Sequence, residues 1–561
     1  MSADSKNPLI VQSDKTLLLD VHAGQAEAAR SAIMPFAELE KSPEHIHTYR
    51  ITPLSLWNAA SAGLSAAHIV NTLETWTRYP IPQGVARGFS DTMERYGKIR
   101  LIAADGAANG AIREGELLLV SDDAAIIAEI AASKNLSKYL AKTEEGFSLR
   151  LVDRGSVKWE LIKLGWPLKD EAPLRDGEPL AVRLRGVTLS GAAFTARDYQ
   201  KEAVRAALGD GAPGSGYGVV ALPCGAGKTI VGIQLMAELN TNTLILTANT
   251  AAAHQWIAEL LDKTELTQDQ IAEYTGDSKR TAPVTVATYQ ILTWRADKNA
   301  DFPHFTLFRA RAWGLIIYDE AHLLPAPVFR ITAELQAVRR LGLTATLVRE
   351  DHEEDAVFSL VGPKRYDMPW KDLEAKGWIA EALCVEIRAK LPEELKIPYA
   401  VASTREKHRI ASENPRKETI VQQLVELHAE ERILVIGQYV QQLERLARLL
   451  NAPGVTGKMP NVERERVYDA FKRGAVKIIV VSKVANFAID LPDASMLIQV
   501  SGSFGSRQEE AQRLGRILRP KKRNSLFYTL VSRYTVEEEF AANRQKFLAE
   551  QGYKYSIQQW E

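Results

Sequence analysis

The chain has 561 residues, 46% of them apolar and 25% charged, which is ordinary for a globular protein and long enough for about three or four domains. Its 70 Lys and Arg balance its 70 Asp and Glu, so bulk charge neither indicates nor excludes a polyanionic partner. Two cysteines without metal-ligand spacing, a polar amino terminus and the lack of a long apolar run predict a cytoplasmic protein without a disulfide framework, signal peptide or membrane partner.

Residues 1–190 are predicted to form an accessory region of α+β structure. Pro8–Val11 and Thr16–Val21 are short apolar runs that favour strands, whereas apolar residues recur with helical spacing between Pro53 and Tyr96. An alanine-rich stretch, Asp122–Ala141, favours a further helix. The tryptophans of this region are predicted to pack in cores rather than to stack on bases, because large aromatic side chains are mostly buried.

From Phe194 onward, short β-rich runs alternate with helical segments, which is typical of a parallel, doubly wound α/β sheet. The runs fall into two sets, so we expect two tandem lobes at 191–365 and 366–561. A polar, weakly periodic stretch at 391–417 is predicted to be an insertion on the second lobe. The predicted strands are Tyr217–Leu222, Thr243–Thr247, Val284–Ala287, Gly314–Tyr318 and Arg340–Thr344, then Arg432–Ile436, Lys477–Val481, Met496–Val500 and Leu526–Leu530.

A glycine-rich string follows the first of these strands and precedes a helical pattern. Glycine lets successive backbone N–H groups wrap a phosphate, and a helix amino terminus favours an anion. Lys228 is expected to neutralise the β- and γ-phosphate oxygens of ATP, and the Thr229 hydroxyl to ligate Mg²⁺. The full pattern has a glycine where this chain has Leu222, and a simple glycine turn before a structural helix is the alternative. The predicted ATP-binding residues of the loop are Gly225, Ala226, Gly227, Lys228 and Thr229.

An Asp-Glu-Ala-His string at 319–322 follows the apolar run Gly314–Tyr318. The carboxyl end of a parallel strand exposes side chains to the ligand crevice. We therefore expect Asp319 to hold Mg²⁺ and Glu320 to orient and deprotonate the attacking water. His322 either senses the γ-phosphate, links to the second lobe or is a hydrogen-bonded core histidine. A solvated acidic strand edge is the alternative for the pair, and the phosphate loop upstream disfavours it.

A third string, residues 508–519, supplies cations near the other end of the chain. Gln512, Arg516 and Arg519 have the spacing i, i+4, i+7, which places them on one face of a helix. A phosphoryl-transfer site uses a cation near the transition state, and a second lobe that closes over the nucleotide would insert both arginines. A surface helix stabilised by salt bridges is the alternative.

These strings, in this order, resemble superfamily 2 helicases with two RecA-like lobes and a DEAH-type acidic motif. The resemblance extends from Phe194 to about residue 550. It implies that Arg197 and Gln200 contact adenine, and that Asp490 approaches the ribose or phosphates from the second lobe. The family usually has glycine where Ala488 stands, which puts the backbone contacts at that turn in doubt.

The same resemblance assigns residues to nucleic-acid contact. Residues 342–346 resemble the motif that couples hydrolysis to movement along nucleic acid, which implies roles for Thr344 and Thr346. Three further segments correspond to elements that grip the phosphodiester backbone through small polar groups and amides. They are Ala248–Ala251, Tyr274–Gly276 and Thr288–Gln290.

A narrower resemblance is to the bacterial branch of the XPB helicases. It implies an ATP-dependent 3′–5′ DNA helicase or duplex translocase tied to repair, with an N-terminal region similar to a damage-recognition domain and a thumb-like insertion at 391–417. A charged tripeptide after the coupling motif is implied to assist strand separation, with an exposed loop salt bridge as the alternative. The residues that carry this resemblance are Pro8–Leu19, Leu222–Thr229, Arg349, Glu350, Asp351 and Ser501–Arg519.

The predicted cofactors are therefore ATP and Mg²⁺, and the predicted partner is forked or partly single-stranded DNA. The family resemblance also allows a nuclease partner. Two alternatives stay open. An RNA-acting helicase is disfavoured by residues 349–351 and the bacterial-type amino terminus. A nucleotide-gated scaffold that does not translocate would be indicated by a damaged Glu320 or Arg516, and both residues are intact.

Overall fold

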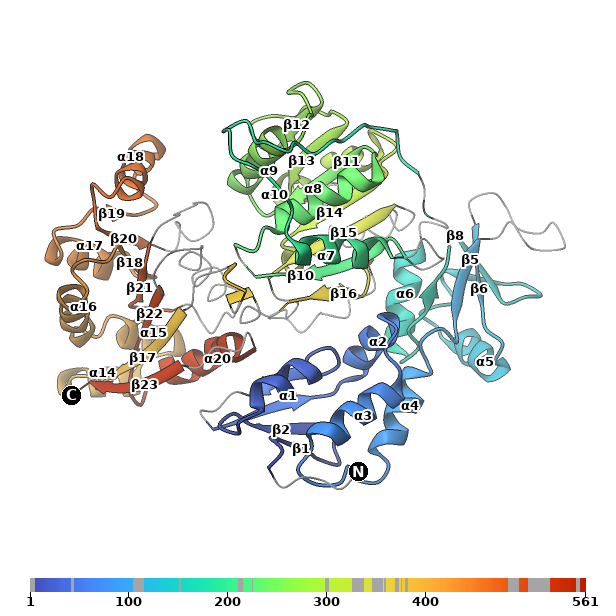
Figure 1. Ribbon diagram of the computed structural model, residues 1–561, viewed down its shortest axis with the longest axis horizontal. Coiled ribbons are helices and arrows are strands. Elements are labelled where there is room, and N and C mark those ends of the chain that lie inside the picture. Colours follow the sequence, from blue (N-terminus) through green and yellow to red (C-terminus); the bar gives the residue numbers. More distant parts are fainter. Residues whose placement is uncertain are drawn as a thin grey trace. The chain divides into compact units, whose positions relative to one another are not determined.

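The chain forms two compact units (Figure 1), and no helix among its described residues is long and apolar enough to cross a bilayer. The first unit comprises Met1–Glu38, Thr48–Leu222 and Gly227–Asp367, and the second comprises Leu39–His47, Pro223–Ala226 and Met368–Glu561. The computed structural model describes residues 6–41, 45–103, 116–150, 153–172, 174, 176–209, 215–223, 225–297, 302–324, 338–345, 357, 360–368, 373–374, 376–378, 382–482, 494–502, 525–550 and 555–560.

Two small sheets with flanking helices come first in the chain, and most of their paired strands run antiparallel, which confirms the predicted α+β character. Trp57 is buried and the other three tryptophans here are half-buried. One sheet has the order β1 (Leu9–Val11), β2 (Thr16–Asp20), β4 (Ile46–Arg50), β3 (Glu38–Lys41), with α1 (Ala26–Ile33), α2 (Pro53–Ser61), α3 (Ala66–Trp76) and α4 (Val85–Met93). The other has the order β7 (Leu140–Lys142), β8 (Phe147–Arg150), β6 (Glu116–Val120), β5 (Arg100–Ala103), β9 (Lys169–Asp170), with α5 (Ala124–Ala132) and α6 (Arg154–Lys163).

The helix predicted in Asp122–Ala141 is shorter than its alanine-rich stretch. It begins after Asp123, whose side chain caps the Ala125 amide, and ends at Ala132. Ser133 then adopts extended backbone angles, and the chain turns into strand β7. The predicted helix is therefore present, and it ends where the helical spacing of the core positions Ile126 and Ile130 stops. Leu136 packs in the same core from the turn that follows.

The remainder of the first unit contains a seven-stranded sheet in which the described strand pairs are parallel. Its central strands are buried along their whole length, as expected for β-branched and aliphatic runs covered on both faces. This confirms the predicted α/β lobe. The sheet order is β12 (Ile271–Tyr274), β13 (Val284–Thr288), β11 (Thr243–Thr247), β14 (Leu315–Asp319), β15 (Arg339–Thr344), β10 (Tyr217–Ala221), β16 (Lys364–Asp367).

Three parallel strands of this lobe end at the same edge of the sheet. Strands β14, β15 and β10 are neighbours, so the segments that follow their carboxyl ends converge. Ala221 at the end of β10 pairs with Thr344 at the end of β15, and Asp319 ends β14. The helical segments are α7 (Asp198–Leu208), α8 (Lys228–Leu239), α9 (Thr250–Lys263), α10 (Tyr289–Thr293), η3 (Pro303–Arg309) and η4 (Ala321–Leu323).

The second unit contains another seven-stranded sheet, and its described pairs are again parallel. Its central strands carry the aliphatic core that the sequence predicted. The sheet order is β19 (Gly454–Val455), β20 (Ile478–Ser482), β18 (Ile433–Gly437), β21 (Met496–Gln499), β22 (Ser525–Ser532), β17 (Ala382–Ala389), β23 (Tyr555–Trp560). The helices are α14 (Glu393–Val401), α15 (Thr404–Ser412), α16 (Arg416–Leu427), α17 (Val440–Leu449), α18 (Asn461–Lys472) and α20 (Val536–Glu550).

The stretch predicted as an insertion, 391–417, forms α14 and α15 and leads into α16. Helix α14 buries no side chain, and its Ile397 and Val401 are 77% and 82% exposed. Its weak apolar periodicity reflects this exposure, since a helix that covers no core needs no apolar stripe.

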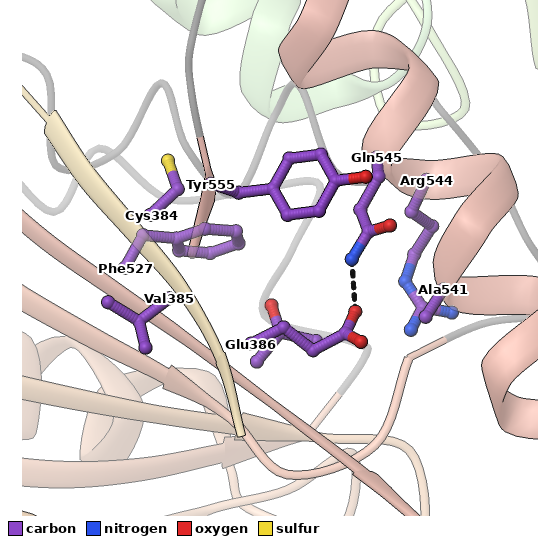
Figure 2. A pocket seen from close by; sticks show the side chains of 9 residues that line it. Cys384, Val385, Glu386, Phe527, Ala541, Arg544, Gln545 and Tyr555 are labelled. Atoms are coloured by element: carbon purple, nitrogen blue, oxygen red, sulfur yellow. Dashed lines mark hydrogen bonds between the residues drawn. The ribbon is translucent and has the colours of Figure 1, made fainter. Parts of the chain in front are cut away.

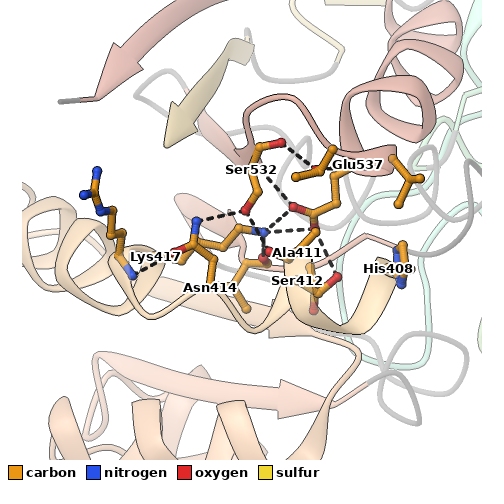
Figure 3. Close-up of polar contacts among 12 residues, drawn as sticks. His408, Ala411, Ser412, Asn414, Lys417, Ser532 and Glu537 are labelled. Atoms are coloured by element: carbon orange, nitrogen blue, oxygen red, sulfur yellow. Dashed lines mark hydrogen bonds and ion pairs between the residues drawn. The ribbon is translucent and has the colours of Figure 1, made fainter. Parts of the chain in front are cut away.

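A buried polar network joins the end of α15 and the start of α16 to α20 (Figure 3). The Lys417 ammonium lies 2.8 Å from a Glu537 carboxylate oxygen and donates to the Val500 carbonyl at 3.0 Å. Ser412 and the Ser532 amide also donate to Glu537. The chain directly after β21 is therefore tied at Val500 to α16.

A second buried acid lies in a small pocket between β17 and α20 (Figure 2). The Gln545 amide donates to Glu386 there, and the Arg388 guanidinium pairs with the same carboxylate. Burial raises the pKa of Glu386 above its usual value, and the charge of Arg388 opposes this. Glu386 and Gln545, which line the pocket, bond to one another, so we assign this pair a structural role in the second sheet.

Candidate nucleotide-binding and hydrolysis site

The glycine-rich loop has the backbone that a phosphate cradle needs. Gly225 and Gly227 have φ angles of 80° and 78°, in the left-handed region that side chains disfavour. A Cβ on Gly227 would lie 2.5 Å from Gln200 Nε2, whereas a Cβ on Gly225 would point into open space. Helix α8 begins at Lys228 directly after the loop, so its first N–H groups and positive dipole end face the same space.

Asp319 lies at the carboxyl end of β14 and is held from two directions. Its Oδ1 accepts the Glu320 amide at 3.1 Å, and its Oδ2 accepts the Trp256 indole N–H at 2.9 Å. Burial and the neighbouring Glu320 charge raise the pKa of Asp319 to about 6, and the Lys228 charge opposes this. A buried carboxylate beside a second one is an environment that favours a bound cation.

Glu320 faces the loop lysine across the same edge. The Lys228 Nζ lies 3.3 Å from Glu320 Oε1, and both side chains are largely buried. Burial alone would raise the pKa of Glu320, but the charges of Lys228 and His322 lower it below its usual value. Glu320 is also a non-glycine residue with a left-handed backbone, φ 49°, which is a strained conformation of the kind found at functional sites.

His322 connects the acidic pair to the end of β15. Its Nδ1 lies 2.7 Å from Thr344 Oγ1 and 3.5 Å from Glu320 Oε2, and the residue is 5% exposed. Among the alternatives for His322, the described contacts are those of a hydrogen-bonded core histidine. His322 thereby links Glu320 to Thr344, a residue of the predicted coupling motif.

The two residues predicted to contact adenine lie at the start of α7. The Arg197 amide donates to Gln200 Oε1 at 2.9 Å, and the Arg197 guanidinium donates to the Tyr199 hydroxyl at 3.1 Å. Gln200 is buried, and its amide nitrogen lies against Gly227. The structure therefore brings Gln200 to the phosphate loop.

The predicted site residues divide between those that the structure describes and those that it does not. Thr229 is half-buried in the first turn of α8, next to Lys228. Ala226 is buried within the loop. The remaining predictions lie outside the described residues: Thr346, Arg349, Glu350, Asp351, Asp490, Gln512, Arg516 and Arg519.

The residues at this edge fit ATP and Mg²⁺ by their chemistry. Backbone amides at a helix amino terminus, a lysine and a threonine hydroxyl suit a polyphosphate. Two carboxylates beside them suit a hard cation. The described residues contain no cluster of three or more His, Cys, Asp or Glu that would cage a metal. Mg²⁺ is usually held by one or two carboxylates together with substrate phosphates.

Two contacts at Asp319 were missed from the sequence. Trp256 donates to its carboxylate, and the Tyr289 hydroxyl donates to its main-chain carbonyl at 2.9 Å. Trp256 looks like a core residue in the sequence, whereas Tyr289 belongs to a segment expected to grip DNA, and both side chains are buried. No spacing rule connects them to Asp319, because they come from α9 and α10.

A phosphate loop after β10 and an acidic pair at the end of β14, on the two strands that flank β15 in a parallel sheet, together with a second parallel sheet in the chain, define a helicase-type nucleotide-hydrolysing motor. Three family models match the chain: "ERCC3/RAD25/XPB C-terminal helicase" at 373–560, "Type III restriction enzyme, res subunit" at 193–349, and "Helicase conserved C-terminal domain" at 9–145.

Full-length relatives place the chain within one family. It is 52% identical to the DNA 3′-5′ helicase XPB of Kineococcus radiotolerans, over 98% of this chain and 96% of that one. It is 50% identical to the protein of the same name from Mycobacterium tuberculosis, over 98% and 97%. It is 32% identical to the general transcription and DNA repair factor IIH helicase/translocase subunit XPB of Encephalitozoon cuniculi, over 98% and 82%. The chain belongs to the XPB family of ATP-dependent DNA 3′-5′ helicases.

Proposed function

We propose that this chain hydrolyses ATP with Mg²⁺ at the carboxyl edge of its first seven-stranded sheet, and that it uses the energy to separate the strands of forked or partly single-stranded DNA during repair. The observation that carries the proposal is the Lys228–Glu320 ion pair beside Asp319. A cation for phosphate oxygens, a base for water and a ligand for Mg²⁺ lie there within one cluster, on strands whose carboxyl ends meet.

Each described residue has a proposed task. The amides of Gly225–Gly227 bind phosphate oxygens, and Lys228 neutralises their charge. Thr229 and Asp319 hold Mg²⁺, which when bound neutralises further charge on those oxygens. The pKa of Glu320 is lowered, so its carboxylate is ionised at neutral pH and accepts a proton from the attacking water. Arg197 and Gln200 recognise adenine.

The residues outside the described part complete the proposal on the strength of the family resemblance. Arg516 and Arg519, with Gln512, supply transition-state cations and polar contacts from the second lobe, and Asp490 contacts the ribose or phosphates. Thr344 and Thr346 couple hydrolysis to movement on DNA. Residues 349–351 assist strand separation.

The proposed domains follow the predicted boundaries. Residues 191–365 and 366–561 are the two motor lobes, and residues 1–190 are an accessory region that includes a domain similar to damage-recognition domains. The helices at 391–417 are the proposed thumb-like insertion. A cytoplasmic repair helicase of this kind is suited to work with a nuclease that cuts the strands it opens.

One assay tests the proposal directly. ATPase rates are measured without nucleic acid and with single-stranded, duplex and forked DNA, and strand displacement is compared on DNA and RNA forks with defined 3′ tails. We expect stimulation by DNA and displacement of the DNA fork from its 3′-tailed strand. ATPase activity that ignores DNA, or faster displacement of RNA, would overturn the proposal.

A further inference from the structure

Two of the three segments predicted to grip DNA are linked to Asp319 by a hydrogen bond, one directly and one through the helix that begins in it. Trp256 donates its indole N–H to Asp319 Oδ2, and Tyr289 donates its hydroxyl to the Asp319 carbonyl, each at 2.9 Å. Trp256 is 1% exposed and Tyr289 is 4% exposed, so water does not compete for either bond.

Each donor is fixed to one of the gripping segments. Helix α9, which carries Trp256, begins within the segment 248–251, and the Asn249 side chain caps it by accepting the Ala252 amide at 2.9 Å. Tyr289 is the middle residue of the segment 288–290 and the first residue of α10, capped in turn by Thr288. A shift of either segment therefore moves a donor of Asp319.

The indole of Trp256 is also wedged between α8 and β14. A Cβ on Gly232 of α8 would lie 2.6 Å from the indole ring and 3.2 Å from the Ile317 side chain of β14. Glycine is required at position 232 because the ring occupies the space of a side chain. A core packed this closely transmits displacement rather than absorbing it, so α9 cannot move without disturbing the strand that ends at Asp319.

We propose that Trp256 and Tyr289 are positioning residues that convey DNA contact at segments 248–251 and 288–290 to the Asp319 carboxylate, and thereby set how tightly Mg²⁺-nucleotide is held. The inference rests on the proposed function, in which Asp319 is a Mg²⁺ ligand. DNA that orders the two segments orders both donors, and the carboxylate is then presented in one orientation. Since coupling between two binding sites is reciprocal, Mg²⁺-nucleotide must tighten DNA binding by the same factor.

The test is an equilibrium measurement that requires no turnover. The affinity of the full chain for a fluorescent, non-hydrolysable ATP analogue with Mg²⁺ is measured with and without a single-stranded oligonucleotide, and the affinity for the oligonucleotide is measured with and without the analogue. We expect a coupling factor in the wild type of about fivefold or more, within the usual range for coupled sites. Tyr289→Phe removes one donor and keeps the ring, and Trp256→Phe removes the other donor and keeps a smaller aromatic ring. In both variants the factor should fall at least about threefold, equally in the two directions.

Two matched variants control for the loss of a buried hydrogen bond. Trp313→Phe removes an indole N–H that donates to the Leu307 carbonyl at 3.1 Å, and Tyr217→Phe removes a hydroxyl that donates to the Asp170 carbonyl at 3.1 Å. Both residues are buried in the same unit, and neither of these hydrogen bonds involves Asp319. The controls should keep the wild-type coupling factor.

The outcomes separate the inference from the function on which it rests. A wild type that does not bind the Mg²⁺-nucleotide overturns the proposed function. A wild type that binds it with no response to DNA overturns the inference alone, as does full coupling in both Trp256→Phe and Tyr289→Phe. Equal loss in the control variants would also overturn it, because the effect would then be general loosening. Should one test variant fail to fold, as judged by thermal unfolding, the other still decides the result.

Discussion

Lys228 and Glu320 neutralise one another across the carboxyl edge of the first sheet, with Nζ 3.3 Å from Oε1. The proposed phosphate-binding cation and the proposed base are therefore mutual partners in this structure. The charge of Lys228 helps to lower the pKa of Glu320 against the effect of burial. Because the two groups are linked, a change to either one alters the protonation of the other as well as its own task.

Lys228→Ala should abolish ATP hydrolysis and weaken ATP binding, because it removes the charge that faces the phosphate oxygens. It also leaves Glu320 buried without its cation, so the pKa of that carboxyl should rise and fewer molecules should carry the base at neutral pH. The measurement is steady-state ATPase with DNA present, where a loss of about 100-fold or more corresponds to roughly 3 kcal/mol. Lys201→Ala is the control, since that lysine pairs with Asp198 on the exposed start of α7. A rate within about threefold of wild type would remove the phosphate-loop assignment.

Glu320→Gln should keep ATP and Mg²⁺ binding while nearly stopping turnover, because an amide fills the same space but accepts no proton from water. The variant should stay bound to DNA when ATP is present. Nucleotide binding by fluorescence, turnover by phosphate release, and retention on DNA are measured together. Arg516→Ala should show a similar rate but no retention, since the contact proposed between the second lobe and the γ-phosphate is missing. Normal hydrolysis by Glu320→Gln would show that another group is the base.

The position of the acidic pair and of the phosphate loop was predictable because each directly follows an apolar strand. Parallel strands that are buried on both faces read as continuous aliphatic runs, and the residue after such a run lies at the ligand edge. Asp319 and Lys228 could thus be placed together before any contact was known. The α+β character of the accessory region was predictable on the same grounds, from short runs whose period matches strand or helix.

The partners of those residues could not be predicted, because pairing across long sequence separations has no periodic signature. Trp256 and Asp319 are 63 positions apart, and Lys417 and Glu537 are 120 apart. From the sequence alone, an isolated tryptophan in a helix is taken for a core residue and an isolated lysine for a surface residue. Only the packing of α9 beside β14, or of α16 beside α20, turns these side chains into hydrogen-bond partners.

Glu537→Gln should destabilise the second unit strongly. Lys417 is fully buried, and its partner carboxylate is 4% exposed, so the amide would leave a buried ammonium uncompensated. Breaking such a pair costs about 3–5 kcal/mol. The comparison is Glu418→Gln, which breaks the more exposed pair with Arg445 and should cost less than about 1 kcal/mol. Urea unfolding of both variants measures the difference, and equal midpoints would contradict the buried role of the pair.

A second buried network predicts how stability depends on pH. Asp170 accepts from Arg154 at 2.6 Å and from Lys158 at 3.1 Å, and all three side chains are buried. Burial lowers the pKa of Lys158 to about 8, with the Arg340 and Arg154 charges adding to this and Asp170 opposing it. In the unfolded chain this lysine holds its proton to a higher pH, so between about pH 8 and 10 the unfolded state binds more protons than the folded state.

The stability of the wild type should therefore rise with pH across that window relative to Lys158→Met, which has no titrating group there. The expected gain is about 1–2 kcal/mol, since one pKa unit corresponds to about 1.4 kcal/mol. Urea unfolding of both proteins at pH 7.5, 8.5 and 9.5 measures it. A difference that is constant or that falls with pH would show that Lys158 remains charged in the folded protein throughout.

Arg349, Glu350 and Asp351 are proposed to decide between strand separation and translocation alone. They follow the coupling motif on the first lobe and are distant in sequence from the loop and the acidic pair, although they lie outside the described residues. Changing all three to Ala should leave DNA-stimulated hydrolysis within a few-fold of wild type. Unwinding of a forked duplex should fall by at least about tenfold, which is roughly 1.4 kcal/mol of lost coupling. ATPase and strand displacement are measured on the same fork. Parallel loss of both activities would assign the tripeptide a structural role, and loss of neither would remove it from the mechanism of strand separation.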